Sequence, residues 1–168
     1  GGGLVPGSIV LLAGEPGIGK STLLLHLCQN LKNVLYVSGE ESAPQLKMRW
    51  QRLGLKNPQS QVLTETDVDR ILAVAEEVNP QLLIIDSIQT VYDSRYPSTP
   101  GSIAQVKESA LRFQQWTKSA STATILVGHL TKEGAVAGPK ALEHLVDIVL
   151  YLEGERFENL RILRGAKN

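Results

Sequence analysis

Short apolar runs alternate with amphipathic stretches along the whole chain. The clearest runs lie at residues 9–13, 34–37, 82–85 and 123–127, and a weaker one lies at 62–64. Runs of this length, bounded by polar or turn-forming residues, are typical of strands buried in a sheet. Two further runs, at 148–152 and 159–163, are close enough in sequence to form a hairpin. We therefore predict an α/β fold with a mostly parallel, doubly wound sheet and an antiparallel C-terminal hairpin at one edge.

The stretches between these runs carry helix signals. A helix is expected to begin near Gly19, directly after the first run. Ser42 and Gln45 have the spacing of a capping box, which predicts a helix over residues 43–53. Asp67 is expected to cap a helix that continues through residue 78, and Ser102 is expected to cap a longer one. Strands and helices thus alternate, as a parallel sheet requires.

Residues 14–21 carry the strongest chemical signal. They read Gly14-Glu15-Pro16-Gly17-Ile18-Gly19-Lys20-Ser21, followed by Thr22, and fit the phosphate-loop pattern G-x-x-x-x-G-K-S/T. The run before them and the helix signal after them supply the strand–loop–helix context of that motif. In such a loop the backbone amides approach phosphates, the lysine reaches the β- and γ-phosphates, and the hydroxyl ligates Mg²⁺. We predict that residues 14–22 bind ATP or ADP, with Mg²⁺ at Ser21.

Asp86 directly follows the apolar run at 82–85. Ligands of open α/β sheets lie at the carboxyl ends of the strands, so this carboxylate is expected beside the phosphates. There it would hold Mg²⁺ together with Ser21, through a water molecule. An aspartate that only caps the turn before Ser87 is the alternative.

Two acidic residues, Glu40 and Glu41, follow the run at 34–37 through a serine and a glycine. Hydrolysis of a nucleoside triphosphate needs a carboxylate that positions or deprotonates the attacking water. We assign this catalytic role to Glu40 and keep Glu41 as the main alternative. Acids placed before a helix also stabilise its dipole, and either residue suits that role.

Polar and basic residues follow the run at 123–127. His129 is expected to hydrogen-bond the γ-phosphate, and a histidine satisfied by nearby backbone is the alternative. Lys132 and Lys140 flank a glycine-bearing loop that suits contact with a DNA backbone, although ordinary surface loops share this composition. Nearby aromatic residues that would stack on bases are missing, so such a contact would be electrostatic and poor in sequence preference.

The C-terminal hairpin carries several cations. They are Arg156, Arg161, Arg164 and Lys167. Phosphoryl transfer often uses a cation from outside the pocket. A solvated basic strand face is the alternative, and the sequence alone favours it.

Composition limits the partners and the cellular compartment that we expect for this protein. The 168 residues include 17 basic and 17 acidic residues, with a net charge of 0, so DNA contact would depend on a local patch. The single Cys28 excludes an intrachain disulfide or a multi-cysteine zinc site, is expected in the core, and suits the reducing cytoplasm. No apolar stretch reaches the ~18 residues that cross a membrane. The first residues lack the features of a targeting signal, and the ending at Lys167 and Asn168 suggests that the chain is a fragment.

Several motifs together resemble one family, the RecA-like ATPase domain of the bacterial RadA/Sms DNA repair proteins. The similar stretches lie at residues 14–21, 37–42, 84–90, 127–134, 137–140 and 142–144. The stretch around Lys132 is more specific than the phosphate loop, which many families share. The resemblance covers almost the whole chain and implies that residues 1–168 form a single RecA-like domain.

The resemblance also implies an ATP-dependent motor in homologous recombination and branch migration. Its partners would be single-stranded or branched DNA, and it would assemble as a hexameric ring. Glu40 falls at the water-activating position, His129 at the nucleotide-sensing position, and residues 131–140 at a DNA-contacting loop. Residues 164–168 approach a Lys-Asn-Arg-Phe-Gly motif of the subunit interface, of which Lys167 and Asn168 are present. The family's four-cysteine zinc motif and its Lon-protease-like domain are absent from these 168 residues. Because the interface motif is cut short, strong nucleotide binding with slow turnover is expected.

Two other functions are compatible with a phosphate loop. A nucleotide-dependent ring scaffold or switch, similar to the clock ATPases, would share the fold and the paired glutamates without binding DNA. A small-molecule kinase would need a second substrate pocket and a lid, for which the sequence offers no residues. Salt-dependent DNA binding separates the first alternative from the motor, because contacts to phosphates weaken steeply as salt rises.

Overall fold

A seven-stranded sheet forms the centre of the computed structural model, which describes residues 3–56, 59–130, 139–154 and 160–167. In chain order the strands are β1 (Ile9–Gly14), β2 (Lys32–Ser38), β3 (Gln59–Thr64), β4 (Leu82–Asp86), β5 (Ala123–His129), β6 (Ile148–Gly154) and β7 (Arg161–Lys167). Their order across the sheet is β3-β2-β4-β5-β1-β6-β7. Strands β1 to β6 pair in parallel, and β7 runs antiparallel to β6 at one edge. The predicted fold class is confirmed.

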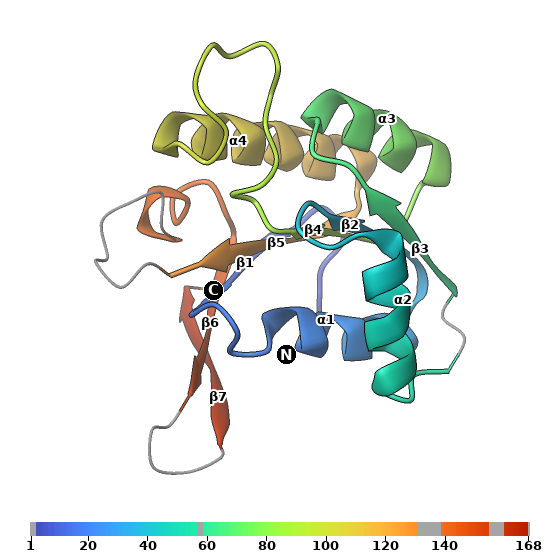
Figure 1. The fold of residues 1–168 in the computed structure, drawn as a ribbon. Coiled ribbons are helices and arrows are strands. Elements are labelled where there is room, and N and C mark those ends of the chain that lie inside the picture. The colour runs from blue at the N-terminus through green and yellow to red at the C-terminus, as the bar shows by residue number, and fades with distance from the viewer. Residues whose placement is uncertain (1–2, 57–58, 131–138, 155–159, 168) are drawn as a thin grey trace.

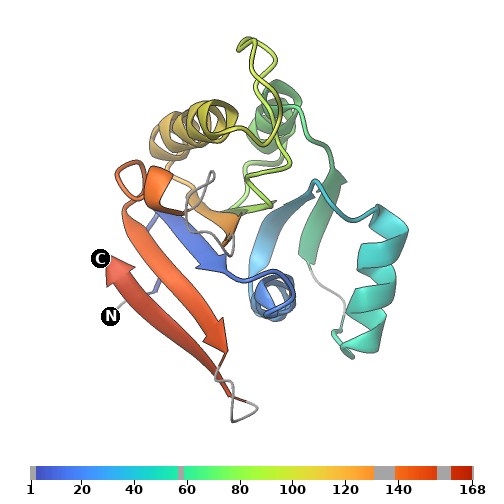
Figure 2. The ribbon, with the colours of Figure 1, turned by 60° about the vertical axis from the view of Figure 1, so that its left-hand side comes forward.

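Helices cover both faces of this sheet, as a doubly wound topology requires (Figures 1 and 2). They are α1 (Lys20–Gln29), α2 (Ala43–Arg52), α3 (Val68–Val78) and α4 (Ile103–Ala120), with a short 3-10 helix at Pro139–Ala141. Helices α3 and α4 lie side by side on one face, whereas α1 lies on the other with α2 near the β3 edge. Along the described ranges, no helix combines the length and the apolar character needed to cross a bilayer.

Alternation of side chains along the strands divides the core into two clusters. Leu11 of β1 packs in the cluster that includes Ile71 of α3 and Phe113 of α4. Val10, its neighbour in the same strand, points to the opposite face and packs in the cluster with Cys28 of α1. Successive residues of a strand point to opposite faces, so near-continuous apolar runs are what a sheet covered on both sides needs. The predicted core position of Cys28 is confirmed, since its exposed fraction is 0%.

The predicted helix starts agree with the capping contacts. The backbone amide of Ser42 donates to Gln45 Oε1 at 2.8 Å, as in a capping box. Asp67 accepts hydrogen bonds from the amides of Asp69 and Arg70, and Ser102 accepts one from the amide of Gln105. Several strand bounds differ from the predicted runs: β3 begins at Gln59 rather than at residue 62, β2 at Lys32 rather than at residue 34, and β7 covers Arg161–Lys167 rather than residues 159–163. Backbone pairing with β6 sets the bounds of β7, and the apolar run marks only its first part.

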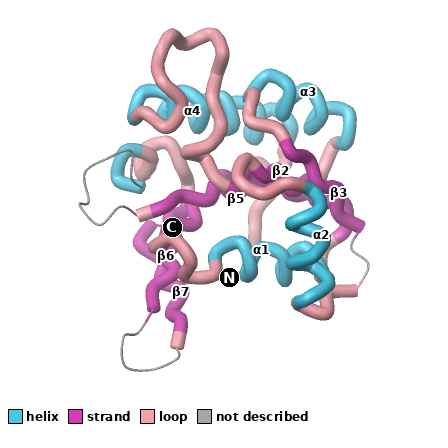
Figure 3. The backbone as a smooth tube through the Cα atoms, in the orientation of Figure 1, coloured by secondary structure: helices cyan, strands magenta, loops and turns pink. Residues whose placement is uncertain are grey.

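The long loop between β4 and α4 rises beside α4 (Figure 3). Polar side chains hold this loop in place. Gln105 Nε2 donates to three backbone carbonyls of the loop, those of Asp93, Tyr96 and Ser98. Asp93 is fully buried and accepts hydrogen bonds from the guanidinium groups of Arg95 and Arg112. The hydrogen bond from Arg95 is the main reason that the pKa of Asp93 is lowered to about 2.

Candidate nucleotide-binding site

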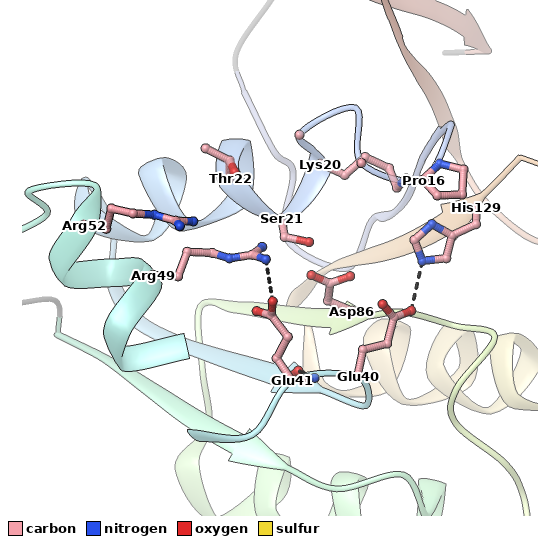
Figure 4. Close-up of a pocket in the computed structure, with 13 residues that line it drawn as sticks. Pro16, Lys20, Ser21, Thr22, Glu40, Glu41, Arg49, Arg52, Asp86 and His129 are labelled. Carbon is pink, nitrogen blue, oxygen red and sulfur yellow. Dashed lines mark hydrogen bonds and ion pairs between the residues drawn. The ribbon is translucent and has the colours of Figure 1, made fainter. Parts of the chain in front are cut away.

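The carboxyl ends of four neighbouring strands surround one cavity of about 280 Å³ (Figure 4). Strands β1, β2, β4 and β5 end at Gly14, Ser38, Asp86 and His129 respectively. The residues that line the cavity are Pro16, Gly17, Gly19, Lys20, Ser21, Thr22, Ser38, Glu40, Glu41, Arg49, Arg52, Asp86 and His129. The cavity therefore lies where ligands of open α/β sheets bind.

The loop between β1 and α1 has a backbone that suits close approach of an anion. Gly17 and Gly19 have φ angles of +77° and +110°, which side chains rarely permit. At Gly17, no other heavy atom lies within 4 Å of the place that a Cβ would occupy. No side-chain hydrogen bond caps α1 at Gly19 within the described part of the chain, so its first amides remain available. Free amides at the positive end of a helix dipole form an anion-binding site.

Lys20 projects from the first turn of α1 and is almost buried, with an exposed fraction of 4%. Its ammonium group donates to the carbonyls of Gly14 at 2.8 Å and Glu15 at 2.9 Å. Burial lowers the pKa of Lys20, although the charges of Asp86 and Glu40 act in the opposite direction. An ammonium group held at the edge of an amide-lined loop suits a polyphosphate, because that ligand supplies the charge that offsets desolvation.

Asp86 lies deep in the cavity and is oriented by a buried phenol. The Tyr36 hydroxyl donates to Asp86 Oδ2 at 2.5 Å, and Tyr36 is only 1% exposed. Burial, followed by the charge of Asp86, raises the pKa of Tyr36 well above its usual value, so the phenol stays a donor. Ser21 and Asp86 line the same cavity and would hold Mg²⁺ together with oxygens of the nucleotide and water. Nowhere in the described ranges do three His, Cys, Asp or Glu side chains gather into a metal site of their own.

Glu40 and Glu41 turn in different directions, as Figure 4 shows. Glu40 Oε1 accepts a hydrogen bond from the Ser87 hydroxyl at 2.7 Å and lies 3.0 Å from His129 Nε2. Burial alone would raise the pKa of Glu40, but hydrogen bonds from Ser87 and His129 and the charge of Lys20 outweigh it and lower that pKa. Glu40 is therefore a carboxylate at neutral pH.

Glu41 forms an ion pair with Arg49 of α2 instead. Its backbone amide also donates to the Ser38 hydroxyl oxygen, at 3.0 Å. The ion pair holds Glu41 on the α2 side of the cavity, whereas Glu40 lies beside Ser87 and His129. This geometry favours the assignment of the catalytic role to Glu40.

Most residues of the predicted site meet in this cavity. The loop residues Pro16, Gly17, Gly19, Lys20, Ser21 and Thr22 line it together with Glu40, Asp86 and His129, which are distant in sequence. Gly14 and Glu15 contribute through their carbonyls, which hold Lys20. The side chain of Ile18 faces away and packs in the core cluster on the α1 side, where it also approaches Gly154.

The predicted DNA and interface residues lie elsewhere. Lys132 is outside the described residues, and Lys140 is exposed in the short 3-10 helix. Lys167 donates to the carbonyls of Glu143 and Val146, both at 2.7 Å. Lys140 and Lys167 are therefore not part of the cavity lining.

The basic residues of the C-terminal hairpin differ in their surroundings. Arg164 pairs with Glu153 across the hairpin, and Arg156 is outside the described residues. The Arg161 guanidinium lies against the phosphate loop, with Nη1 3.2 Å from the place that a Cβ on Gly19 would occupy. Among the hairpin cations that the structure describes, Arg161 is the one that lies beside the loop.

Sequence reasoning missed five residues of this site: Tyr36, Ser38, Arg49, Arg52 and Ser87. Arg49 and Arg52 are three positions apart on α2, the spacing that places two side chains on one helix face. That spacing was visible in the sequence, but nothing indicated that the face would turn toward the cavity. Tyr36 lay within an apolar run and was indistinguishable from an ordinary core residue.

Comparison with known proteins agrees with this geometry. A family model described as an AAA domain matches residues 1–135. The chain belongs to the AAA domain family. Over its whole length it is also 55% identical to the DNA repair protein RadA of Halalkalibacterium halodurans, 52% to that of Pseudomonas aeruginosa and 49% to that of Aquifex aeolicus. The resemblance to the ATPase domain of the RadA/Sms family is thus confirmed, and the chain spans 38% of the length of each of these three relatives.

A solved structure supports the same fold. A chain described as an ATPase domain superposes with a TM-score of 0.77 over 98% of this chain and 78% of that one. Its sequence is only 15% identical, so the match concerns the architecture alone. The fold is RecA-like, and the family match indicates an ATPase domain.

Proposed function

We propose that this domain is the core of a DNA-dependent ATPase motor that acts in DNA repair by homologous recombination and branch migration. The main support is the cavity in which Lys20, Ser21 and Asp86 face Glu40 across the ends of three strands. A cation, a hydroxyl, a buried carboxylate and an ionised base are what binding and hydrolysis of Mg-ATP require. The relatives named DNA repair protein RadA support a role in DNA repair.

Each residue has a role in the proposed reaction. The amides of the phosphate loop and Lys20 bind the β- and γ-phosphates. Mg²⁺, held at Ser21 with Asp86 behind it, would neutralise part of the phosphate charge. Glu40 accepts a proton from the attacking water, and His129 hydrogen-bonds both Glu40 and the γ-phosphate. Since Glu40 Oε1 already has two partners, Oε2 is the oxygen that takes the proton.

DNA contact is proposed for the segment around Lys132 and Lys140, and a hexameric ring with Lys167 near the interface is proposed for the complete protein. Charged contacts to a phosphate backbone carry little sequence information, so we expect binding of single-stranded or branched DNA without strong sequence preference.

Nucleotide binding is tested first, by calorimetry of Mg-ADP on the wild-type protein and on Lys20→Ala. The variant is expected to lose at least ten-fold in affinity, because a buried charge-assisted contact is removed. Lys140→Ala, exposed and outside the cavity, serves as the matched control and should bind normally. The absence of heat from the wild-type protein would refute the proposal.

Hydrolysis is then measured with and without single-stranded DNA at several salt concentrations. Stimulation by DNA that weakens as salt rises supports the motor. Nucleotide binding without any salt-dependent DNA binding would instead favour the ring scaffold. The glutamates are separated in the same assay: Glu40→Gln should lower turnover by about 10²-fold or more while retaining ATP, and Glu41→Gln should have the smaller effect. The reverse result would assign the catalytic role to Glu41.

A further inference from the structure

The carboxylate of Glu40 is anchored through one of its two oxygens. Both the Ser87 hydroxyl and His129 Nε2 approach Oε1, at 2.7 Å and 3.0 Å. Ser87 has an exposed fraction of 0%, whereas the side chain of Glu40 is 46% exposed. A half-exposed glutamate has several rotamers open to it, so a buried donor beneath the carboxylate selects among them.

The backbone around Ser87 is fixed on both sides. The carbonyl of Asp86, which precedes it, accepts a hydrogen bond at 2.9 Å from the amide of Gly39, one residue before Glu40. The carbonyl of Ser87 accepts from both the amide and the hydroxyl of Thr90, at 3.1 Å and 2.7 Å. A Cβ added to Gly39 would lie 2.0 Å from Thr90 Oγ1, which shows how closely the segment carrying Glu40 approaches this turn. The Ser87 hydroxyl is thus presented from a rigid position.

The contact from His129 cannot replace that of Ser87. Its direction depends on which ring nitrogen carries the proton, and His129 Nδ1 has no hydrogen-bond partner in the described part of the protein. A serine hydroxyl can always donate to a carboxylate. Ser87 can therefore always donate to Glu40, whereas His129 donates only when its Nε2 carries the proton.

We propose that Ser87 is a positioning residue, which orients the Glu40 carboxylate so that Oε2 faces the attacking water. The inference rests on the proposed function, in which Glu40 is the catalytic base. Ser87 acts only through Glu40 and does not itself contact the nucleotide.

Charged groups around Glu40 set the direction of the pH effect. Lys20 and His129 face it from α1 and β5, Asp86 lies beside Lys20, and the ion pair of Glu41 and Arg49 borders the cavity on the α2 side. Ser87 is the hydrogen-bond donor that lowers the pKa of Glu40 most, against the upward effect of burial. Removing this donor raises that pKa, so a larger fraction of Glu40 is protonated at acidic pH.

The test is steady-state ATP hydrolysis by the complete protein as a function of pH, for the wild type and Ser87→Ala. We expect kcat to fall about ten-fold, as for loss of one hydrogen bond to a charged group. KM should change less than about two-fold, because binding of the nucleotide does not use this hydroxyl, and the acidic limb of the pH profile should move to higher pH. Ser109→Ala is the matched control, because Ser109 is also 0% exposed but its hydroxyl has no partner in the described residues.

Two further variants distinguish positioning from packing. Ser87→Cys keeps a donor at this position, although a weaker one on a larger atom, so its kcat should lie between those of the wild type and Ser87→Ala. In a Glu40→Gln background, Ser87→Ala should have little additional effect, since the two residues act as one unit. Additive losses, or a pH profile of Ser87→Ala identical to that of Ser109→Ala, would overturn the positioning role. If Glu40→Gln keeps normal turnover, the base assignment itself fails, and the positioning role fails with it.

Discussion

The hydrogen bond from Tyr36 to Asp86 offers a sharp test of how the proposed Mg²⁺ side of the cavity is built. Tyr36→Phe removes one oxygen from a side chain that is 1% exposed and leaves the ring in its core cluster. No cavity larger than a hydroxyl results, so packing should change little. The lost interaction is the donor to Asp86 Oδ2, a carboxylate that is itself only 7% exposed.

The expected loss in the free energy of unfolding follows from how deeply Tyr36 and Asp86 are buried. A hydrogen bond to a charged group contributes about 1.5–3 kcal/mol, and leaving a buried carboxylate short of a donor places the loss toward the upper end of that range. Tyr151→Phe is the matched control, because Tyr151 also donates to a carboxylate, that of Glu143, at 3.1 Å but in a less buried setting. Its cost should be about 1 kcal/mol or less.

Urea unfolding at neutral pH measures the free energy of unfolding of Tyr36→Phe, of Tyr151→Phe and of the wild type. The Mg²⁺ concentration that half-saturates ATP turnover measures the effect of each substitution on the site. Tyr36→Phe should lower the free energy of unfolding and raise the required Mg²⁺ concentration, since Asp86 is no longer held in one orientation. Tyr151→Phe should leave the Mg²⁺ requirement unchanged. Equal stability of Tyr36→Phe and the wild type, with an unchanged Mg²⁺ requirement, would refute the argument.

Two other predictions concern the loop and the turn that flank the site. Asp93→Asn should lower the free energy of unfolding at neutral pH by about 2 kcal/mol, because the pKa of Asp93 is about 2 in the folded protein against 3.8 ordinarily. This contribution to stability is present above the ordinary pKa and is lost as the pH falls toward 2. In urea titrations, the difference in free energy of unfolding between the wild type and Asp93→Asn should therefore become smaller as the pH falls from 3.8 to about 2. A difference that stays constant over these pH values would contradict the prediction. Gly39→Ala should cost about 1–3 kcal/mol, since its Cβ would lie 2.0 Å from Thr90 Oγ1. Thr90→Ala, which removes that hydroxyl, should recover part of the loss in the double variant, and purely additive losses would argue against the clash.

The phosphate loop and the strand ends were predictable for a physical reason. The loop is local, so its consecutive residues carry the signal without knowledge of the tertiary structure. Asp86, Glu40 and His129 lie far apart in sequence, but each follows an apolar run. Because parallel strands bring their carboxyl ends to one edge, the position after each run was sufficient to place all three in a single cavity.

Other features depended on tertiary placement and were not predictable. The face of α2 that carries Arg49 borders the cavity only because the helix packs beside β3. In the sequence, Ser87 is only the residue behind Asp86, since its role depends on the direction in which Glu40 turns. The extent of β7 follows from its pairing with β6, and an apolar run does not encode pairing.

The two adjacent glutamates lie in the bend that follows β2 and face different partners. Glu40 turns toward Ser87 and His129, and Glu41 turns toward Arg49. A guanidinium stabilises the carboxylate of Glu41 at one oxygen, whereas a hydroxyl and a ring nitrogen both approach one oxygen of Glu40. A base must stay ionised yet keep a lone pair for the water, and in the proposed reaction Glu40 meets both conditions through Oε2.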